Sequence, residues 1–245
     1  FFCEMLSDRS RYIAALASPA SIDTLHFSAH GLIGEIPSSI SRLCYLTRLF
    51  LNDNSLTDSI PHELGTLGEL IELNLHNNSL TGTIPTDICR LRNLTDLLLS
   101  NNQLSGSIPH QIGDLGNLKR LWLHNNNFTG SIPVELSKLK NLNELKLCNN
   151  QLEGEIPPEF SKLQNLRILY LYKNHLDGNI PKELAKLTIL GDLELQNNRF
   201  TGEIPQELIT VSRSLYVNIS FNYLMEPESK LPSTWEADNA FRIYS

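Results

Sequence analysis

Two pairs of side chains in the sequence are of the types that carry out chemistry in enzymes. His124 and Cys148 are 24 residues apart, and so are Glu72 and Asp96. A thiol beside an imidazole can act as a nucleophile with its general base, and two carboxylates are the pair that most glycosidases use. The first pair has no evident orienting acid or oxyanion donor, and the second has no evident cleft that would raise one carboxyl pKa. We therefore expect a protein that is not an enzyme.

Both spacings equal the period of a repeat that runs through the chain. A fixed period of 24 residues is typical of a solenoid, in which each repeat forms one turn that stacks on its neighbours. An asparagine marks each repeat, and His30 occupies the first slot. One full repeat reads Leu115-x-x-Leu118-x-x-Leu121-x-Leu123-x-x-Asn126-x-Phe128-x-Gly130-x-Ile132-Pro133. The marker asparagines are Asn54, Asn78, Asn102, Asn126, Asn150, Asn174, Asn198 and Asn222.

The apolar positions of the repeat predict a stacked sheet. Leu121, Trp122 and Leu123 alternate as in a short strand, whose successive side chains point to opposite faces. Stacked about 4.8 Å apart in parallel, such strands bury their leucines and leave the intervening residues on a concave surface. After each Ile-Pro pair, an acid often stands three residues before a base, as in Glu135 and Lys138. This spacing predicts short helices or 3-10 turns on the convex side.

The polar and glycine positions also predict structural roles. We expect the marker asparagines to turn inward and bond backbone groups of adjacent turns, forming an asparagine ladder. The chain must bend sharply after the ladder, and a glycine stands there in every repeat except at Asp58. Aspartate tolerates such a backbone geometry better than most residues. The glycines are Gly34, Gly82, Gly106, Gly130, Gly154, Gly178 and Gly202.

Segments such as Leu73-Asn74-Leu75-His76-Asn77-Asn78-Ser79-Leu80-Thr81-Gly82-Thr83-Ile84-Pro85 resemble the plant-type LxGxIP class of leucine-rich repeats. This class includes receptor-kinase ectodomains, receptor-like proteins and polygalacturonase-inhibiting proteins. The resemblance implies an α/β solenoid: a right-handed leucine-rich-repeat superhelix with a concave parallel β-sheet, convex short helices or 3-10 turns, and a second small sheet. It also implies a function that resides in the concave strands and not in a catalytic motif.

The two ends depart from this class, whose members usually carry cysteine pairs in their terminal caps. Cys3 stands alone before the repeats, and no cysteine follows Cys148. The end turns of a solenoid must still be covered, since they expose apolar core to water. We expect an N-terminal cap or degenerate repeat at 1–21, the repeats at 22–224, and a C-terminal cap at 225–245.

One patch of aromatic side chains is predicted on the concave strands. Trp122, His124, Lys146, Tyr170 and Tyr172 fall on three adjacent strands, and tryptophan and tyrosine are enriched at interface hot spots. The central exposed column is predicted to be His26, Phe50, Asn74, Leu98, Trp122, Lys146, Tyr170, Glu194 and Asn218. The predicted partner-binding residues are Phe50, His76, Arg120, Trp122, His124, Lys146, Tyr170 and Tyr172.

A column of charged residues follows one edge of the concave sheet. Its alternating signs predict cross-strand ion pairs around Arg120. The neighbouring acids Glu72 and Asp96 could accept a cation or a basic partner residue, and ordinary solvation is the simpler expectation. The column is Arg48, Glu72, Asp96, Arg120, Glu144 and Asp192.

Composition limits the partners. The 245 residues carry a formal net charge of −7, which argues against a nucleic-acid partner, since phosphate binding needs a clustered basic surface. No window approaches the roughly 18 consecutive apolar residues of a membrane span. The four cysteines include no CxxC motif and no close pair, so neither a zinc site nor a disulfide framework is expected. We expect no cofactor.

These observations predict a recognition module that binds a protein, peptide or glycan on the concave face. The alternative is a structural or scaffold subunit of a larger assembly. The cellular location of the protein stays open. The resemblance implies an extracellular or cell-surface protein, whereas an exposed, unpaired Cys148 would favour a reducing compartment. Four Asn-x-Ser/Thr sequons arise readily from the repeat itself and carry little weight: Asn77, Asn93, Asn127 and Asn218.

Overall fold

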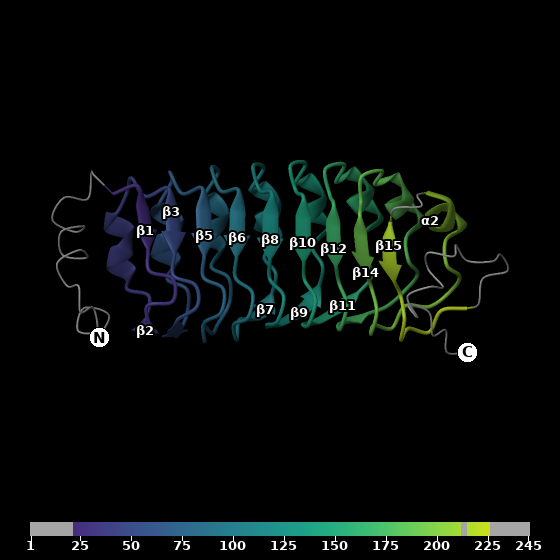
Figure 1. The fold of residues 1–245 in the computed structure, drawn as a ribbon, viewed down its shortest axis with the longest axis horizontal. Helices are drawn as coiled ribbons and strands as arrows, with labels where there is room; N and C mark the ends of the chain where they lie inside the picture. Colours follow the sequence, from purple (N-terminus) through teal and green to yellow (C-terminus); the bar gives the residue numbers. More distant parts are fainter. Residues whose placement is uncertain (1–21, 212–214, 226–245) are drawn as a thin grey trace.

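The computed structural model of the protein describes residues 22–211 and 215–225. Within them the chain winds through similar turns that stack along one axis, from β1 (Thr24–His26) at one end to α2 (Gln206–Val211) and β15 (Tyr216–Asn218) at the other (Figure 1). The predicted solenoid is therefore confirmed. The predicted cap at 1–21 lies outside the described residues, as does the predicted C-terminal cap except for Met225. No helix in the described ranges is long and apolar enough to cross a membrane.

The main sheet takes one strand from each turn. Its strands are parallel and follow chain order, and their register pairs residues 24 apart, such as Leu97 with Leu121 and Leu121 with Leu145. Residues 24 apart in the sequence are therefore side by side on adjacent strands, as the repeat predicted. The strands are β1 (Thr24–His26), β3 (Arg48–Phe50), β5 (Glu72–Asn74), β6 (Asp96–Leu98), β8 (Arg120–Trp122), β10 (Glu144–Lys146), β12 (Ile168–Tyr170), β14 (Asp192–Glu194) and β15 (Tyr216–Asn218).

A second row of short parallel strands confirms the small sheet that the resemblance implied. It is divided into two parts, β2 (Ile33–Glu35) with β4 (Ser55–Thr57), and a four-stranded part. The strands of the larger part are β7 (Ser105–Ser107), β9 (Asn127–Ser131), β11 (Gln151–Gly154) and β13 (His175–Leu176).

The other side of the turns carries 3-10 helices, as predicted, except in the last described turn, where α2 takes their place. Each begins directly after the proline of an Ile-Pro pair, whose ring fixes an extended backbone (φ −64° at Pro133) before the helix. An acid and a base with the expected spacing form an ion pair in η4, where Asp87 Oδ1 and Arg90 Nη1 are 2.9 Å apart. These helices are η2 (Ser38–Arg42), η3 (His62–Thr66), η4 (Thr86–Arg90), η5 (His110–Asp114), η6 (Val134–Lys138), η7 (Pro158–Lys162) and η8 (Lys182–Lys186).

Leucines and the asparagine ladder fill the interior. Leu121 and Leu123 are fully buried, and the amide of Asn126 lies among them. Its Nδ2 donates to the carbonyl oxygen of Leu99 at 3.0 Å, and its Oδ1 accepts from the backbone N–H of Leu104 at 3.0 Å. The ladder thus satisfies backbone groups that the turns leave unpaired, as predicted.

The bend after the ladder requires a left-handed backbone. The glycines there have positive φ, and Asp58 adopts the same conformation with φ 63°. A second left-handed position, which the pattern did not predict, precedes each ladder residue and is filled by Asn77 (φ 53°) and its equivalents. Asparagine is the residue besides glycine that most readily adopts it. Side-chain amides at this position bond across turns, as from Asn77 to Asp53 and from Asn101 to Asn77, at 2.6 Å each.

Candidate recognition surface

The outward face of the main sheet holds the predicted aromatic patch on β8, β10 and β12. We call Trp122, His124, Lys146, Tyr170 and Tyr172 the aromatic cluster. The register places Lys146 between Trp122 and Tyr170, and its Nζ lies 4.2 Å from the first ring centroid and 5.5 Å from the second. At such distances an ammonium group is attracted to the ring faces. His124 and Tyr172 extend the cluster. The ring centroid of His124 lies 6.1 Å from that of Trp122, and the ring centroid of Tyr172 lies 6.1 Å from that of Tyr170.

Glu144 fixes the centre of this cluster, although it was not among the predicted binding residues. Its Oε2 accepts a hydrogen bond from Trp122 Nε1 at 2.9 Å and lies 3.3 Å from Lys146 Nζ. Glu144 stands two residues before Lys146 on one strand, so both side chains leave the same face, which is the signal that could have identified it. The cluster therefore has fixed ring positions and an internally neutralised cation.

The expectation that Cys148 is exposed on this face is wrong. Its side chain is buried, with 1% of the residue exposed, and its thiol is hydrogen-bonded with Tyr172. Burial raises the thiol pKa to about 11, whereas burial together with Lys146 lowers the pKa of His124 to about 4. Near neutral pH the two groups are an uncharged thiol and an uncharged imidazole. The argument for a reducing compartment, which relied on an exposed thiol, no longer holds.

The central column also differs from the prediction. Asn74 and Leu98 are buried, with 8% and 3% of each residue exposed, because they lie in register beside larger side chains such as Trp122. Phe50 is not part of the aromatic cluster. It lies three strands from Trp122 and packs edge-on against His26, with ring centroids 5.2 Å apart.

His76 lies between these two regions, just after β5. Its Nδ1 is 2.8 Å from the Oδ1 of Asn74, and its Nε2 is 3.5 Å from the Oδ2 of Asp53. His76 and Phe50 therefore remain candidates for an extended binding surface outside the aromatic cluster.

The predicted ion pairs around Arg120 are formed. Its Nε contacts the carboxylate of Asp96, and its Nη2 lies 4.0 Å from Glu72. Asp96 is buried and also accepts a hydrogen bond from the Thr95 hydroxyl at 2.7 Å. The two acids are thus joined by an internal cation, and no group of side chains suited to a metal ion occurs among the described residues.

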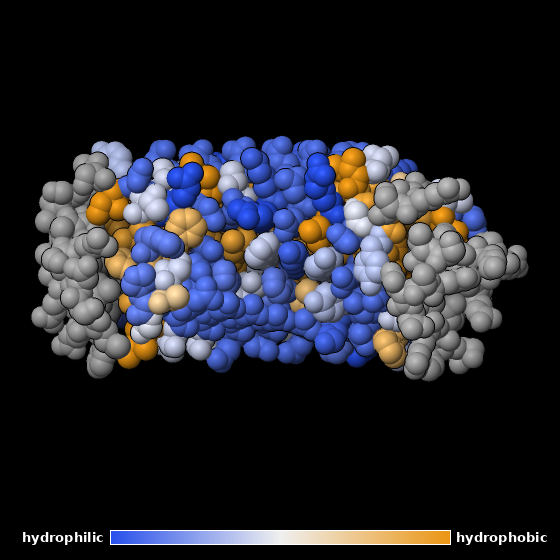
Figure 2. Space-filling model, in the orientation of Figure 1, coloured by the Kyte–Doolittle hydropathy of each residue, from blue (hydrophilic) through white to orange (hydrophobic). Residues whose placement is uncertain are grey.

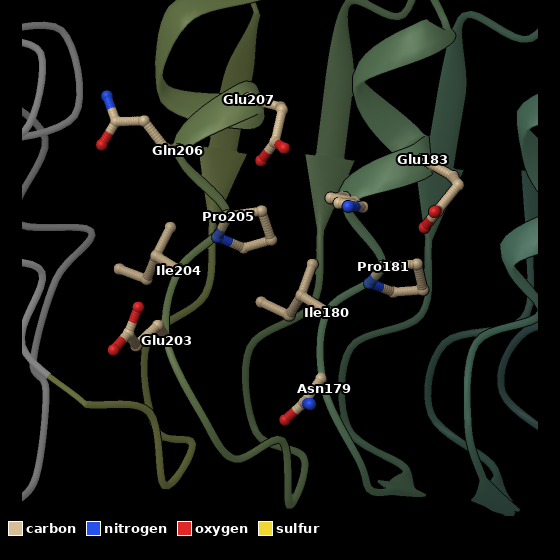
Figure 3. A pocket seen from close by; sticks show the side chains of 10 residues that line it. Asn179, Ile180, Pro181, Glu183, Glu203, Ile204, Pro205, Gln206 and Glu207 are labelled. Atoms are coloured by element: carbon tan, nitrogen blue, oxygen red, sulfur yellow. The ribbon is translucent and has the colours of Figure 1, made fainter.

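A hollow of about 660 Å³ lies away from the main sheet, between the Ile-Pro segments of two successive turns (Figure 3). Its walls include Ile180, Pro181, Ile204 and Pro205. A similar hollow, lined by Ile36, Ile60 and Pro61 among others, lies between earlier turns. Because both hollows lie where successive Ile-Pro segments stack, we interpret them as a product of the repeat and not as sites.

Comparison with known proteins identifies the class. Leucine-rich-repeat family models match residues 38–104, 117–139, 141–163 and 165–187, described as "Leucine rich repeat" and "Leucine Rich Repeat". The chain belongs to the leucine-rich-repeat family. A curated relative, the LRR receptor-like serine/threonine-protein kinase EFR of Arabidopsis thaliana, is 40% identical over 65 residues, which is 26% of this chain and 6% of the relative.

Solved structures place the chain close to plant receptor ectodomains. It is 39% identical to the ectodomain of the Arabidopsis thaliana receptor kinase GASSHO1/SCHENGEN3, crystallised with CASPARIAN STRIP INTEGRITY FACTOR 2, with a TM-score of 0.81 over 86% of this chain and 25% of that one. It is 41% identical to the Arabidopsis receptor kinase HAESA, crystallised with the peptide hormone IDA and the co-receptor SERK1, with a TM-score of 0.81 over 87% and 36%. A plant ice-binding protein matches at 29% identity, with a TM-score of 0.76 over 88% and 69%. The chain thus spans about a third or less of the receptor chains named here.

Proposed function

We propose that this protein binds a peptide along the outward face of its main sheet without chemically changing it. The observation that carries the proposal is the aromatic cluster, in which Glu144 holds Trp122 and Lys146 and so fixes the rings before any ligand arrives. A rigid surface loses little conformational freedom on binding, which favours affinity. Two of the related receptor structures named above were crystallised with a ligand, CASPARIAN STRIP INTEGRITY FACTOR 2 in one and the peptide hormone IDA in the other, which supports a recognition function here.

An unpartnered polar atom in the cluster supports a ligand as well. The buried Nδ1 of His124 has no hydrogen-bond partner within the described part of the chain. A buried ring nitrogen without a partner costs free energy, which a backbone group of an extended peptide would recover if the imidazole turned toward it. The two strand spacings from β8 to β12, about 4.8 Å each, correspond to roughly three residues of such a peptide.

The surface is less suited to permanent burial in a larger assembly. Figure 2 shows the main-sheet side as largely hydrophilic, with separate apolar patches and no continuous apolar area. Obligate interfaces are larger and more apolar than this. The scaffold alternative therefore receives no support from this face.

Peptides selected from a random-sequence display library on the immobilised protein test the proposal. Their binding to wild type, Trp122→Ala and Tyr170→Ala is measured by calorimetry, with Val134→Ala on η6 as the control, because Val134 is exposed away from the main sheet. We expect a loss of at least about tenfold in affinity for both cluster variants and none for the control. Failure to select any binder, or equal binding by all four proteins, would refute the proposal.

Crosslinking mass spectrometry on the native protein separates the two functions. Crosslinks from a natural partner to β8, β10 and β12 would support peptide recognition. Crosslinks confined to the 3-10 helices would support the scaffold alternative instead.

A further inference from the structure

The C-terminal side of the aromatic cluster has a different chemistry from its centre. Tyr170 and Tyr172 belong to β12 and the residues after it, and Asp192, Glu194 and Gln196 belong to β14 and the residues after it. In the sheet, Tyr170 pairs with Glu194, and both are partly exposed. Two aromatic rings therefore lie beside two carboxylates on one continuous part of the face.

These carboxylates have no cation to balance them. Neither Asp192 nor Glu194 forms an ion pair in the described part of the chain, and Glu194 accepts only a neutral hydrogen bond, from Gln196 Nε2 at 3.1 Å. Lys146 lies two strands away on β10, is already paired with Glu144 at 3.3 Å and has a side chain only 19% exposed. Negative charge at this place is thus uncompensated, in contrast to Asp96, which contacts Arg120.

The negative potential extends over both tyrosines. Burial raises the pKa of Tyr170, and the charges of Asp192 and Glu194 raise it further. The pKa of Tyr172 is raised by burial and by its hydrogen bond with Cys148, with a further contribution from Glu194. A potential that disfavours a phenolate favours a cation at the same position.

A hydrogen-bond acceptor completes the arrangement. Gln196 uses its Nε2 to bond Glu194, and its buried Oε1 has no partner in the described ranges. A planar guanidinium offers several N–H donors and stacks on aromatic rings, so it suits the rings and the carboxylates together, and it would reach the Gln196 oxygen if that side chain turned outward. The protein already contains the same type of contact one step along the sheet, where Lys146 lies over two rings beside Glu144.

We propose that Tyr170, Tyr172, Asp192, Glu194 and Gln196 form a subsite for a cationic side chain, preferably arginine, of the bound peptide. This inference rests on the proposed function and adds to it where a basic residue of the peptide lies along the face. From Trp122 on β8 to Glu194 on β14 there are three sheet spacings, about 14 Å, which an extended peptide covers in about four residues. A ligand therefore has a basic residue about four positions from the residue that contacts Trp122.

The test uses the same random-sequence peptide library, selected in parallel on wild type and on the double variant Asp192→Asn with Glu194→Gln. Both changes remove charge while keeping size, and Glu153→Gln on the small-sheet strand β11 is the matched control. We expect wild type and the control to enrich peptides with arginine or lysine, and the double variant to show no such enrichment. An arginine-to-citrulline change in a selected peptide should weaken binding to wild type by about tenfold or more, and binding to the double variant by much less.

The outcomes distinguish this inference from the proposed function. Peptides that need Trp122 but show no basic preference, or that bind the double variant as well as wild type, would overturn the cationic subsite and leave peptide recognition intact. Peptides that do not depend on Trp122 would overturn both. Equal melting temperatures of the double variant and the control exclude misfolding as the cause of a loss.

Discussion

Replacing one ladder asparagine should destabilise the whole solenoid, and Asn126→Ala is the clearest case. The Asn126 amide donates to the carbonyl oxygens of Leu99 (3.0 Å) and Leu123 (3.1 Å) and accepts from Leu104 N–H (3.0 Å). The two carbonyl groups would keep a second partner, because Asn102 also donates to Leu99 and other ladder amides repeat the pattern. The N–H of Leu104 would lose its partner inside the core.

The magnitude follows from these bonds. An orphaned buried N–H costs about 1–3 kcal/mol, and each lost hydrogen bond with a surviving carbonyl about 1 kcal/mol or less. We expect Asn126→Ala to lower the free energy of unfolding by about 3 kcal/mol, a large part of the stability of an ordinary domain.

Urea unfolding followed by circular dichroism measures the loss. Gln103→Ala is the matched control, because Gln103 lies one residue after a ladder asparagine and is exposed. A difference between the two variants below about 1 kcal/mol would refute the view that the ladder satisfies otherwise unpaired backbone groups.

Three further predictions follow from burial and close packing. Gly113→Ala should destabilise by about 1–3 kcal/mol in urea unfolding, because its added Cβ would lie 2.3 Å from a backbone oxygen of the next turn, whereas Gly116→Ala meets nothing within 4 Å and should be nearly neutral. Burial lowers the pKa of His124 from its ordinary 6.5 to about 4 in the folded protein, so below pH 6.5 the unfolded chain binds the proton more readily and stability falls. His124→Gln should lose less stability than wild type between pH 7 and pH 5, and an equal loss would contradict the assigned burial. Alkylation with peptide mapping should modify exposed Cys44 in the native protein but Cys148 only after unfolding, and rapid native labelling of Cys148 would contradict its position.

The repeat made most of the fold predictable, because each position of the repeat recurs many times along the chain with the same type of residue. The position of Leu121 predicted the strand, that of Asn126 the ladder and that of Gly130 the bend. The 24-residue register of the main sheet then placed Trp122, Lys146 and Tyr170 together. A family resemblance supplied the small sheet, which the residue pattern alone did not indicate.

The pattern could not predict how far neighbours cover a side chain. It assigns a residue to a face, but Leu98 and Cys148 are covered because larger side chains lie beside them in the next strands. The contact of Glu144 with Trp122 depends in the same way on side-chain conformation and not on spacing. The predicted binding residues therefore stay a prediction that the proposed measurements decide.

The ladder also determines how a chain of this kind can change its length. Each asparagine bonds a carbonyl 27 residues earlier and an N–H 22 residues earlier, so donors and acceptors match only between whole turns. If the chain gained or lost one complete turn, each asparagine would still face an equivalent carbonyl group and N–H group, and every ladder bond would be kept. An insertion of a single residue would instead move these groups out of register at that point. Duplication in complete units can thus lengthen the binding face and bring new outward side chains with no change to the interior.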